Sequence, residues 1–397
     1  MRFLAFDGLR GLFSIFVVLS HIPAATFLYQ SGLESSGRSL VDLFFVFSGF
    51  VIVAGYEQRL LEGYSFRRFL IARLGRIYPI HVVMLLVFIL TEIAFATILS
   101  PLAPEGRGYF EGPKSLFAIV TNLTLIQAWG IHDQLTWNFP SWSLSTEWAA
   151  YLLFAASLFC LRRRFLYVTV VVIPFSMAML VLVAPDGMSS FQDFGVFRSF
   201  LGFSCGTLSY YLFGYLYQRD MFKTVPVAVF TALELAGFAL MIGLQLAIGR
   251  TEYAVILPVV FILLMVLFAY GRGHISALMS TAPMMYLGAI SLSIYVVHAW
   301  IVLRAGNVMM LVQKLTGITL FDYTADVGQQ YFRLSLSPLA ANLYALVIVV
   351  LTVIVSHFTY RWVELPGQTL FRNWGKKLWP SASPAPQGQP ATLPGTR

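Results

Sequence analysis

Two side chains that hydrocarbon disfavours lie near the start of the chain. Arg10 and His21 are eleven positions apart in a segment that is otherwise mostly apolar. Eleven residues make about three helical turns, so a helix would place both side chains on one face, about 16 Å apart along its axis. Polar groups inside a membrane usually serve a function, and this spacing predicts that both line one channel. In the alternative reading, Arg10 extends to the membrane surface and His21 bonds a neighbouring helix.

A second basic motif lies at the polar end of an apolar segment. Arg73 and Arg76 are three residues apart, so they share a helical face and could grip a phosphate group bidentately. A membrane anchor or a site for anionic lipid headgroups would also explain them. Together with an imidazole deeper in the bundle, the pair suggests a phosphate-bearing substrate whose reactive end reaches inward.

Three further residues extend the candidate site. Glu147 follows Trp142 by five positions, about one turn inside an apolar run, where a carboxylate needs a partner. We expect His21, Glu147 and His298 to lie in the same half of the membrane, where Glu147 could orient an imidazole. Structural roles for Glu147 and His298 remain open. Trp142 and His298 are candidate substrate-binding residues.

Asp42 opens another apolar run, in the sequence Val41-Asp42-Leu43. Asp is favoured at helix starts, which predicts a capping role. A place in the substrate-binding site is the alternative function.

The composition is that of an integral membrane protein. Of the 397 residues, 58% are hydrophobic and only 11% are charged, and the mean hydropathy is +0.77. Two cysteines within apolar runs, Cys160 and Cys205, exclude a disulfide framework or a thiolate metal site. The formal charge of +8 comes from basic residues in short loops, which indicates membrane orientation rather than nucleic-acid binding.

The hydropathy pattern predicts an all-α bundle of about ten transmembrane helices. The predicted spans are 9–28, 40–56, 77–99, 144–161, 166–184, 195–217, 225–248, 253–270, 284–304 and 339–362. A shorter apolar stretch, Leu116 to Trp129, carries several polar residues and is expected to be interfacial or re-entrant. Ten spans with both termini in the cytoplasm place most arginines and lysines inside, as the positive-inside rule requires.

The spans form a single domain, residues 1–370, followed by a cytoplasmic tail, 371–397. The tail is rich in Pro, Gly, Gln and Thr from about residue 380 and is expected to be disordered there. Two long outside segments, 100–143 and 305–338, are candidates for binding loops.

An ordered set of motifs resembles the acyltransferase-3 family of membrane-bound acyltransferases over residues 3 to 370. The motifs are Asp7-Gly8-Leu9-Arg10-Gly11 with His21, Asp42-Leu43-Phe44-Phe45-Val46-Phe47-Ser48-Gly49-Phe50, Arg73-x-x-Arg76-Ile77-Tyr78-Pro79, Trp142-Ser143-Leu144 with Glu147, and Glu364-x-Pro366. The resemblance implies a ten-helix enzyme that moves an acyl group, commonly acetyl, from cytoplasmic acyl-CoA to a hydroxyl of a carbohydrate or glycolipid.

The resemblance also implies roles for particular residues. His21 is the expected catalytic base with Arg10 as its partner, and Arg73 and Arg76 are the expected CoA-contacting pair. No metal is expected. The expected location is the inner (plasma) membrane, and a separate periplasmic or biosynthetic protein is a further candidate partner.

Two other classes of function compete with this expectation. A transporter or flippase could use intramembrane Arg, His and Glu to couple protons or bind a moving substrate. It would usually show repeated halves, and the sequence shows no such repeat. An inactive scaffold or sensor would tolerate the loss of His21.

Overall fold

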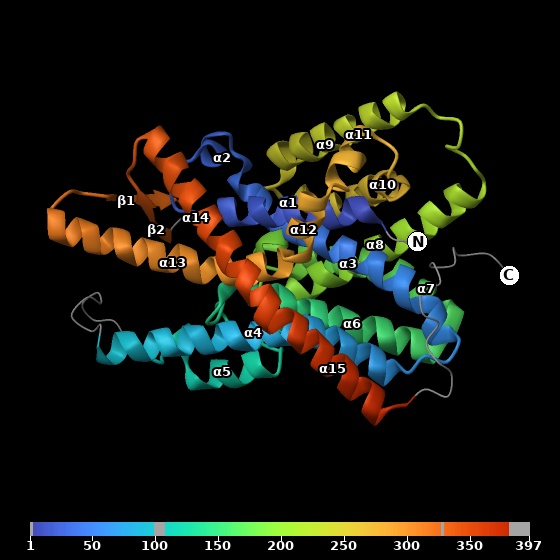
Figure 1. The fold of residues 1–397 in the computed structure, drawn as a ribbon, viewed down its shortest axis with the longest axis horizontal. Coiled ribbons are helices and arrows are strands. Elements are labelled where there is room, and N and C mark those ends of the chain that lie inside the picture. Colours follow the sequence, from blue (N-terminus) through green and yellow to red (C-terminus); the bar gives the residue numbers. More distant parts are fainter. Residues whose placement is uncertain (1–2, 99–107, 327–328, 381–397) are drawn as a thin grey trace.

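The computed structural model describes residues 3–98, 108–326 and 329–380. Within these residues the chain is almost entirely helical (Figure 1). The helices are α1 (Leu4–Ser20), α2 (Phe27–Gln30), α3 (Ser36–Leu61), α4 (Phe66–Thr97), α5 (Leu116–Leu123), α6 (Trp142–Leu161), α7 (Phe165–Ala178), α8 (Gly195–Gln218), α9 (Val227–Ile248), α10 (Leu257–Tyr270), α11 (His274–Met279), α12 (Ala282–Ala289), α13 (Ser291–Thr316), α14 (Pro338–Thr359) and α15 (Leu365–Leu378). The predicted tail from residue 380 lies almost wholly outside the described residues.

Seven stretches of the described residues are long and apolar enough to cross a membrane. They are Gly37–Leu61, Phe66–Thr97, Phe139–Val183, Val227–Ile248, Glu252–Tyr270, Ser291–Thr316 and Pro338–Leu378. The third contains both α6 and α7, which are separated by the turn Arg162–Arg164. The protein is therefore an all-α multi-pass membrane protein, as the sequence predicted. The number of ten crossings and the cytoplasmic termini stay predictions.

The first predicted span was wrong at both ends. The helix α1 begins at Leu4 and ends at Ser20, so His21 is its C-cap rather than a residue in its middle. The reason is Pro23, because the residue before a proline disfavours the helical region and ends the helix there. His21 is therefore held at the junction between a helix and the loop that follows it.

The ninth predicted span, 284–304, is divided in the structure. The short helix α12 ends at Ala289, and α13 begins at Ser291 and continues to Thr316. Gly288 packs so closely on α1 that an added Cβ would lie 1.9 Å from the carbonyl oxygen of Asp7. This contact of two backbones requires glycine, and it holds α12 on α1.

The two long segments 100–143 and 305–338 also differ from the prediction of an all-helical chain. An antiparallel hairpin of β1 (Phe321–Asp326) and β2 (Gln329–Leu334) lies within 305–338. The backbone N–H of Leu334 donates to the carbonyl of Pro23, two residues after His21. The hairpin is therefore fastened to the loop that carries His21. In the other segment α5 has eight residues and a length of about 12 Å, too short to cross a membrane, as predicted.

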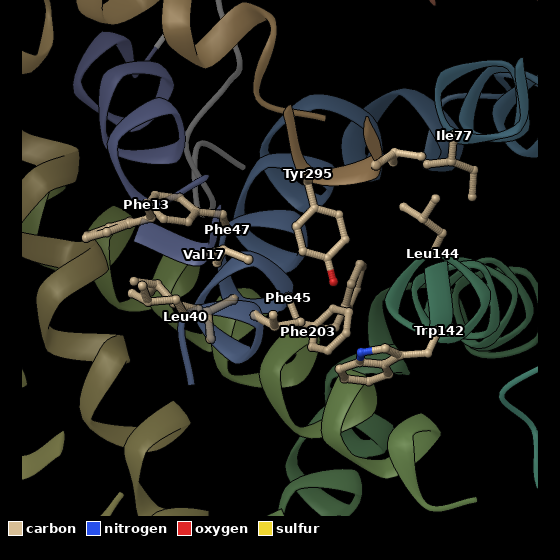
Figure 2. Packing of buried hydrophobic residues seen from close by; sticks show 14 of the residues in the cluster. Phe13, Val17, Leu40, Phe45, Phe47, Ile77, Trp142, Leu144, Phe203 and Tyr295 are labelled. Carbon is tan, nitrogen blue, oxygen red and sulfur yellow. The ribbon is translucent and has the colours of Figure 1, made fainter. Parts of the chain in front are cut away.

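The core of the bundle is built from aromatic and aliphatic side chains of α1, α3, α6, α8 and α13. Figure 2 shows part of this packing around Tyr295, with Phe47 and Leu144 nearby. Glycines bring α3 and α8 together: a Cβ on Gly206 would lie 2.0 Å from the carbonyl oxygen of Val46. Because α3 and α8 pack tightly, the space for a cavity lies beside α4, α6 and α13 instead.

Candidate active site

A cavity of about 110 Å³ lies among α1, α3, α4, α6 and α13. Its polar lining comes from residues far apart in the sequence. These residues are Arg10, Ser48, Arg73, Arg76, Ser143, Glu147, Tyr151, Ser291 and Tyr295. We call it the arginine cavity, because three guanidinium groups face it against a single carboxylate.

The predicted pair Arg73 and Arg76 lines the arginine cavity from one face of α4. Arg73 donates from Nη2 to the hydroxyl of Tyr56 at 2.9 Å and lies 4.8 Å from the centroid of that ring. Its Nε atom is buried and has no partner among the described residues. A buried guanidinium with an unused donor can still bind an anion.

Arg10 reaches the same cavity from α1. Its guanidinium lies 3.8 Å from the carboxylate of Asp7, one turn earlier, and its side chain is 16% exposed. His21 is not among the residues that line this cavity, so a channel shared by Arg10 and His21 stays a prediction. The helix ends at Ser20, so the two side chains occupy different environments.

The carboxylate of the site, Glu147, bonds to hydroxyl groups. Glu147 Oε1 accepts hydrogen bonds from Ser48 Oγ at 2.7 Å and from the hydroxyl of Tyr151. Within the described residues no hydrogen bond joins Glu147 to an imidazole, so the expected carboxylate–imidazole contact was wrong. The cause is position: Glu147 lies on the arginine cavity, where the hydroxyls of Ser48 and Tyr151 bond its Oε1.

The structure brings His21 and His298 together, as the sequence predicted for a shared site. Their ring centroids are 5.0 Å apart, and Phe139 packs on both rings. Each Nδ1 atom faces a backbone carbonyl, of Val17 at 2.8 Å and of Tyr295 at 2.7 Å. A carbonyl cannot donate, so each Nδ1 carries a hydrogen, and in the neutral ring each Nε2 then presents a lone pair. We call these two rings the imidazole pair.

Tyr295 separates the imidazole pair from the arginine cavity. It lines the cavity, and its ring lies 5.9 Å from that of His298, one turn further along α13. Its hydroxyl donates to the carbonyl of Pro140 and accepts from Ser143 Oγ at 2.9 Å. The chemical groups therefore follow one line: guanidiniums, Tyr295, His298 and then His21.

Asp42 and Trp142 are not among the residues that line the arginine cavity, and their assignment as substrate-binding residues stays a prediction. Asp42 is the seventh residue of α3, so it does not cap the helix. It forms two hydrogen bonds of 3.0 Å with the fully buried Arg198 of α8. Trp142 covers the same guanidinium at 4.8 Å. The sequence analysis missed Arg198, whose only signal was a charge within an apolar run.

Within the described residues, no three His, Cys, Asp or Glu side chains lie close enough together to hold a metal ion. The functional groups of the site are thus acid–base groups and guanidiniums.

Comparison with known proteins agrees with the motifs. Residues 3–361 match a family model described as an acyltransferase domain, of the acyltransferase-3 type. The chain is 32% identical over 151 residues to protein 2 in the picA locus of Rhizobium radiobacter, covering 37% of this chain and 77% of that protein. It is 28% identical over 163 residues to the acyltransferase MdmB of Streptomyces mycarofaciens, covering 39% of this chain and 38% of MdmB. No solved structure matches. The chain therefore belongs to the acyltransferase-3 family of membrane acyltransferases.

Proposed function

We propose that this protein transfers an acyl group, most simply acetyl, from cytoplasmic acyl-CoA to a hydroxyl of an exported or membrane-associated carbohydrate. One observation carries the proposal. A cavity lined by three guanidiniums lies next to a pair of imidazoles whose Nδ1 atoms are held by backbone carbonyls.

The arginine cavity suits the donor. Acyl-CoA carries phosphate groups on a long flexible arm, and guanidinium groups bind phosphate bidentately. Arg73 and Arg76 hold the phosphate-bearing part of the donor in this proposal, with Arg10 as the third cation. Glu147 keeps the cavity partly neutralised and orients Tyr151 and Ser48 by hydrogen bonding.

His21 suits the role of general base. An alcohol is a weak acid, so its proton must be removed as its oxygen attacks the thioester carbonyl. The Nδ1–H of His21 is held by the Val17 carbonyl, which leaves Nε2 to accept that proton. General-base catalysis contributes about 10²- to 10⁴-fold to a rate. Alignment of the two substrates and donors to the developing oxyanion supply the remainder.

The position of Tyr295 divides the two substrates. The thioester end of the donor approaches from the arginine cavity, whose lining includes Tyr295, and the acceptor approaches His21 from the opposite side. His21 is half-buried and adjoins the loop to which the hairpin is bonded. A carbohydrate or glycolipid delivered to that side of the inner membrane, by a separate protein if one is needed, meets the imidazole directly.

The substitution His21→Gln tests the proposal. The purified full-length protein, in detergent or lipid nanodiscs, is given acetyl-CoA and simple sugars as acceptor probes, and free thiol is measured. We expect thiol release from the wild type and a loss of about 10²-fold or more in the variant. His274→Gln is the matched control, because His274 is exposed on α11 and should retain full activity.

Two results would contradict the assignment. Wild-type rates from His21→Gln would remove His21 as the base. A wild type that never releases thiol, yet moves a glycolipid across vesicle membranes, would be a transporter.

A further inference from the structure

His298 has a buried nitrogen that the fold does not use. The residue is fully buried, and its Nε2 atom has no hydrogen-bond partner among the described residues. Its other nitrogen is anchored on the carbonyl of Tyr295. Buried polar atoms are almost always paired, so an unpaired one in a candidate active site suggests a partner that arrives during the reaction.

His21 lacks the stabilising neighbour that a general base usually has. In serine hydrolases a buried carboxylate balances the imidazolium that forms when histidine takes a proton. Here the Nδ1–H of His21 faces a neutral carbonyl, and Phe139 covers the ring.

The titratable group in contact with His21 is the second imidazole. The rings are 5.0 Å apart between centroids and inclined at 43°. The two rings are in contact, which makes the unpaired Nε2 of His298 a candidate to take up the proton that His21 acquires. His298 also lies nearer to Tyr295 and hence to the arginine cavity, from which the thioester approaches.

We propose that the imidazole pair is a one-way proton relay: His21 takes the proton from the acceptor hydroxyl, and His298 passes it to the departing thiolate. This inference rests on the proposed function, since it assigns a second catalytic residue to the same reaction. It gives the unpaired Nε2 atom a use and connects the acceptor side with the donor side.

The atoms of the step balance without another reactant. The hydroxyl oxygen bonds to the thioester carbonyl carbon, and the bond between that carbon and sulfur breaks. The hydroxyl proton moves to His21 Nε2, then to His298 Nε2, and then to the thiolate sulfur. The ester and the free thiol leave, and both imidazoles are neutral again.

Two amide substitutions separate proton transfer from hydrogen bonding. His298→Asn keeps a donor near the position of Nδ1, and His298→Gln keeps a polar atom near the position of Nε2. Neither amide takes up a proton. With acetyl-CoA and glucose as probes, we expect each variant to lower kcat by about 10²-fold or more and to leave KM for acetyl-CoA nearly unchanged.

The double variant His21→Gln with His298→Asn provides a stricter test. Residues that act as one unit are not additive, so the double variant should be about as slow as the slower single variant. Two independent roles would instead multiply the losses.

His81 of α4 supplies a matched control. It is fully buried, with Nε2 on the carbonyl of Asn122 and an unpaired Nδ1, but its environment contains no second imidazole among the described residues. His81→Gln preserves the anchored nitrogen position, as His298→Asn does, and should retain nearly full kcat.

The outcomes separate a failure of the proton relay from a failure of the proposed acyltransferase function. Either amide variant of His298 within tenfold of the wild-type kcat, or multiplied losses in the double variant, would overturn the relay while the acyltransferase function stands. A wild type that releases no thiol with any acceptor would instead overturn the proposed function.

Discussion

Arg198 of α8 and Arg73 of α4 have opposite environments in this bundle. Arg198 is fully buried and makes two hydrogen bonds with Asp42, and its remaining donors reach the carbonyls of Arg38 and Ser190. Trp142 and Phe191 cover the faces of its guanidinium. Arg73 instead lines a cavity and keeps one buried donor unpaired.

The contrast shows that charge in a membrane does not by itself identify a site. A guanidinium whose donors are all paired has nothing left to offer a ligand, and it holds helices together instead. A guanidinium with unused donors beside a cavity can bind an anion. Hydrogen-bond satisfaction therefore separates the structural arginine on α8 from the candidate ligand-binding arginines on α4.

The largest effect on stability is expected at the buried ion pair of Arg198 and Asp42. Arg198→Ala leaves the carboxylate of Asp42 buried without a partner, and breaking such a pair costs about 3–5 kcal/mol. We expect a large loss of folded protein and a lower thermal midpoint, measured by thermal unfolding in detergent. The double substitution Arg198→Met with Asp42→Leu removes both charges and should recover much of the loss. If Arg198→Ala kept its thermal midpoint and lost only donor binding, Arg198 would belong to the site.

A smaller and different effect is expected in the arginine cavity. Arg73→Ala with Arg76→Ala removes two cations from the donor site, and we expect the KM for acetyl-CoA to rise by roughly 10- to 100-fold. The thermal midpoint should fall less than in Arg198→Ala, because Arg73 loses a hydrogen bond to the hydroxyl of Tyr56 rather than a buried ion pair. Steady-state kinetics with varied acetyl-CoA measures this. An unchanged KM would remove the pair from the donor site.

The smallest effect is expected at an exposed pair outside the spans. Arg250 donates to Glu34 at 3.0 Å, and the arginine side chain is 61% exposed. Solvent screens such pairs, so Arg250→Gln should change the unfolding free energy by less than about 1 kcal/mol. Activity assays and thermal unfolding of this variant set the baseline for the other two. A loss comparable to that of Arg198→Ala would contradict the role of burial.

The pair of Glu34 and Arg250 makes the stability of the folded protein slightly dependent on pH. Partial burial raises the pKa of the Glu34 carboxyl, and Arg250 opposes that rise. A carboxyl with a raised pKa in the folded state favours the folded state below its usual pKa, and this contribution is lost as the pH rises through the folded value. We therefore expect Arg250→Gln to make stability slightly more dependent on pH near the carboxyl range, measured by thermal midpoints from pH 4 to 7.

Much of the site could be predicted from local patterns. Hydropathy indicated the membrane helices, and three-residue spacing placed Arg73 and Arg76 on one face, because helical geometry is a local property. The motifs around Arg10, His21 and Glu147 indicated the family. The end of α1 at Ser20 could also be predicted, since Pro23 disfavours a helical conformation in the residue before it.

The sequence by itself determined that this is a helical membrane protein of the acyltransferase-3 family. It also showed which polar residues lie within the apolar segments. Only the tertiary structure decided how those residues pair: His21 with His298, Asp42 with Arg198, and Glu147 with Ser48 and Tyr151. The reason is that composition and helical period fix which face of its own helix a side chain takes. Which other helix it meets depends on packing across the bundle, between residues up to 277 positions apart, as His21 and His298 are.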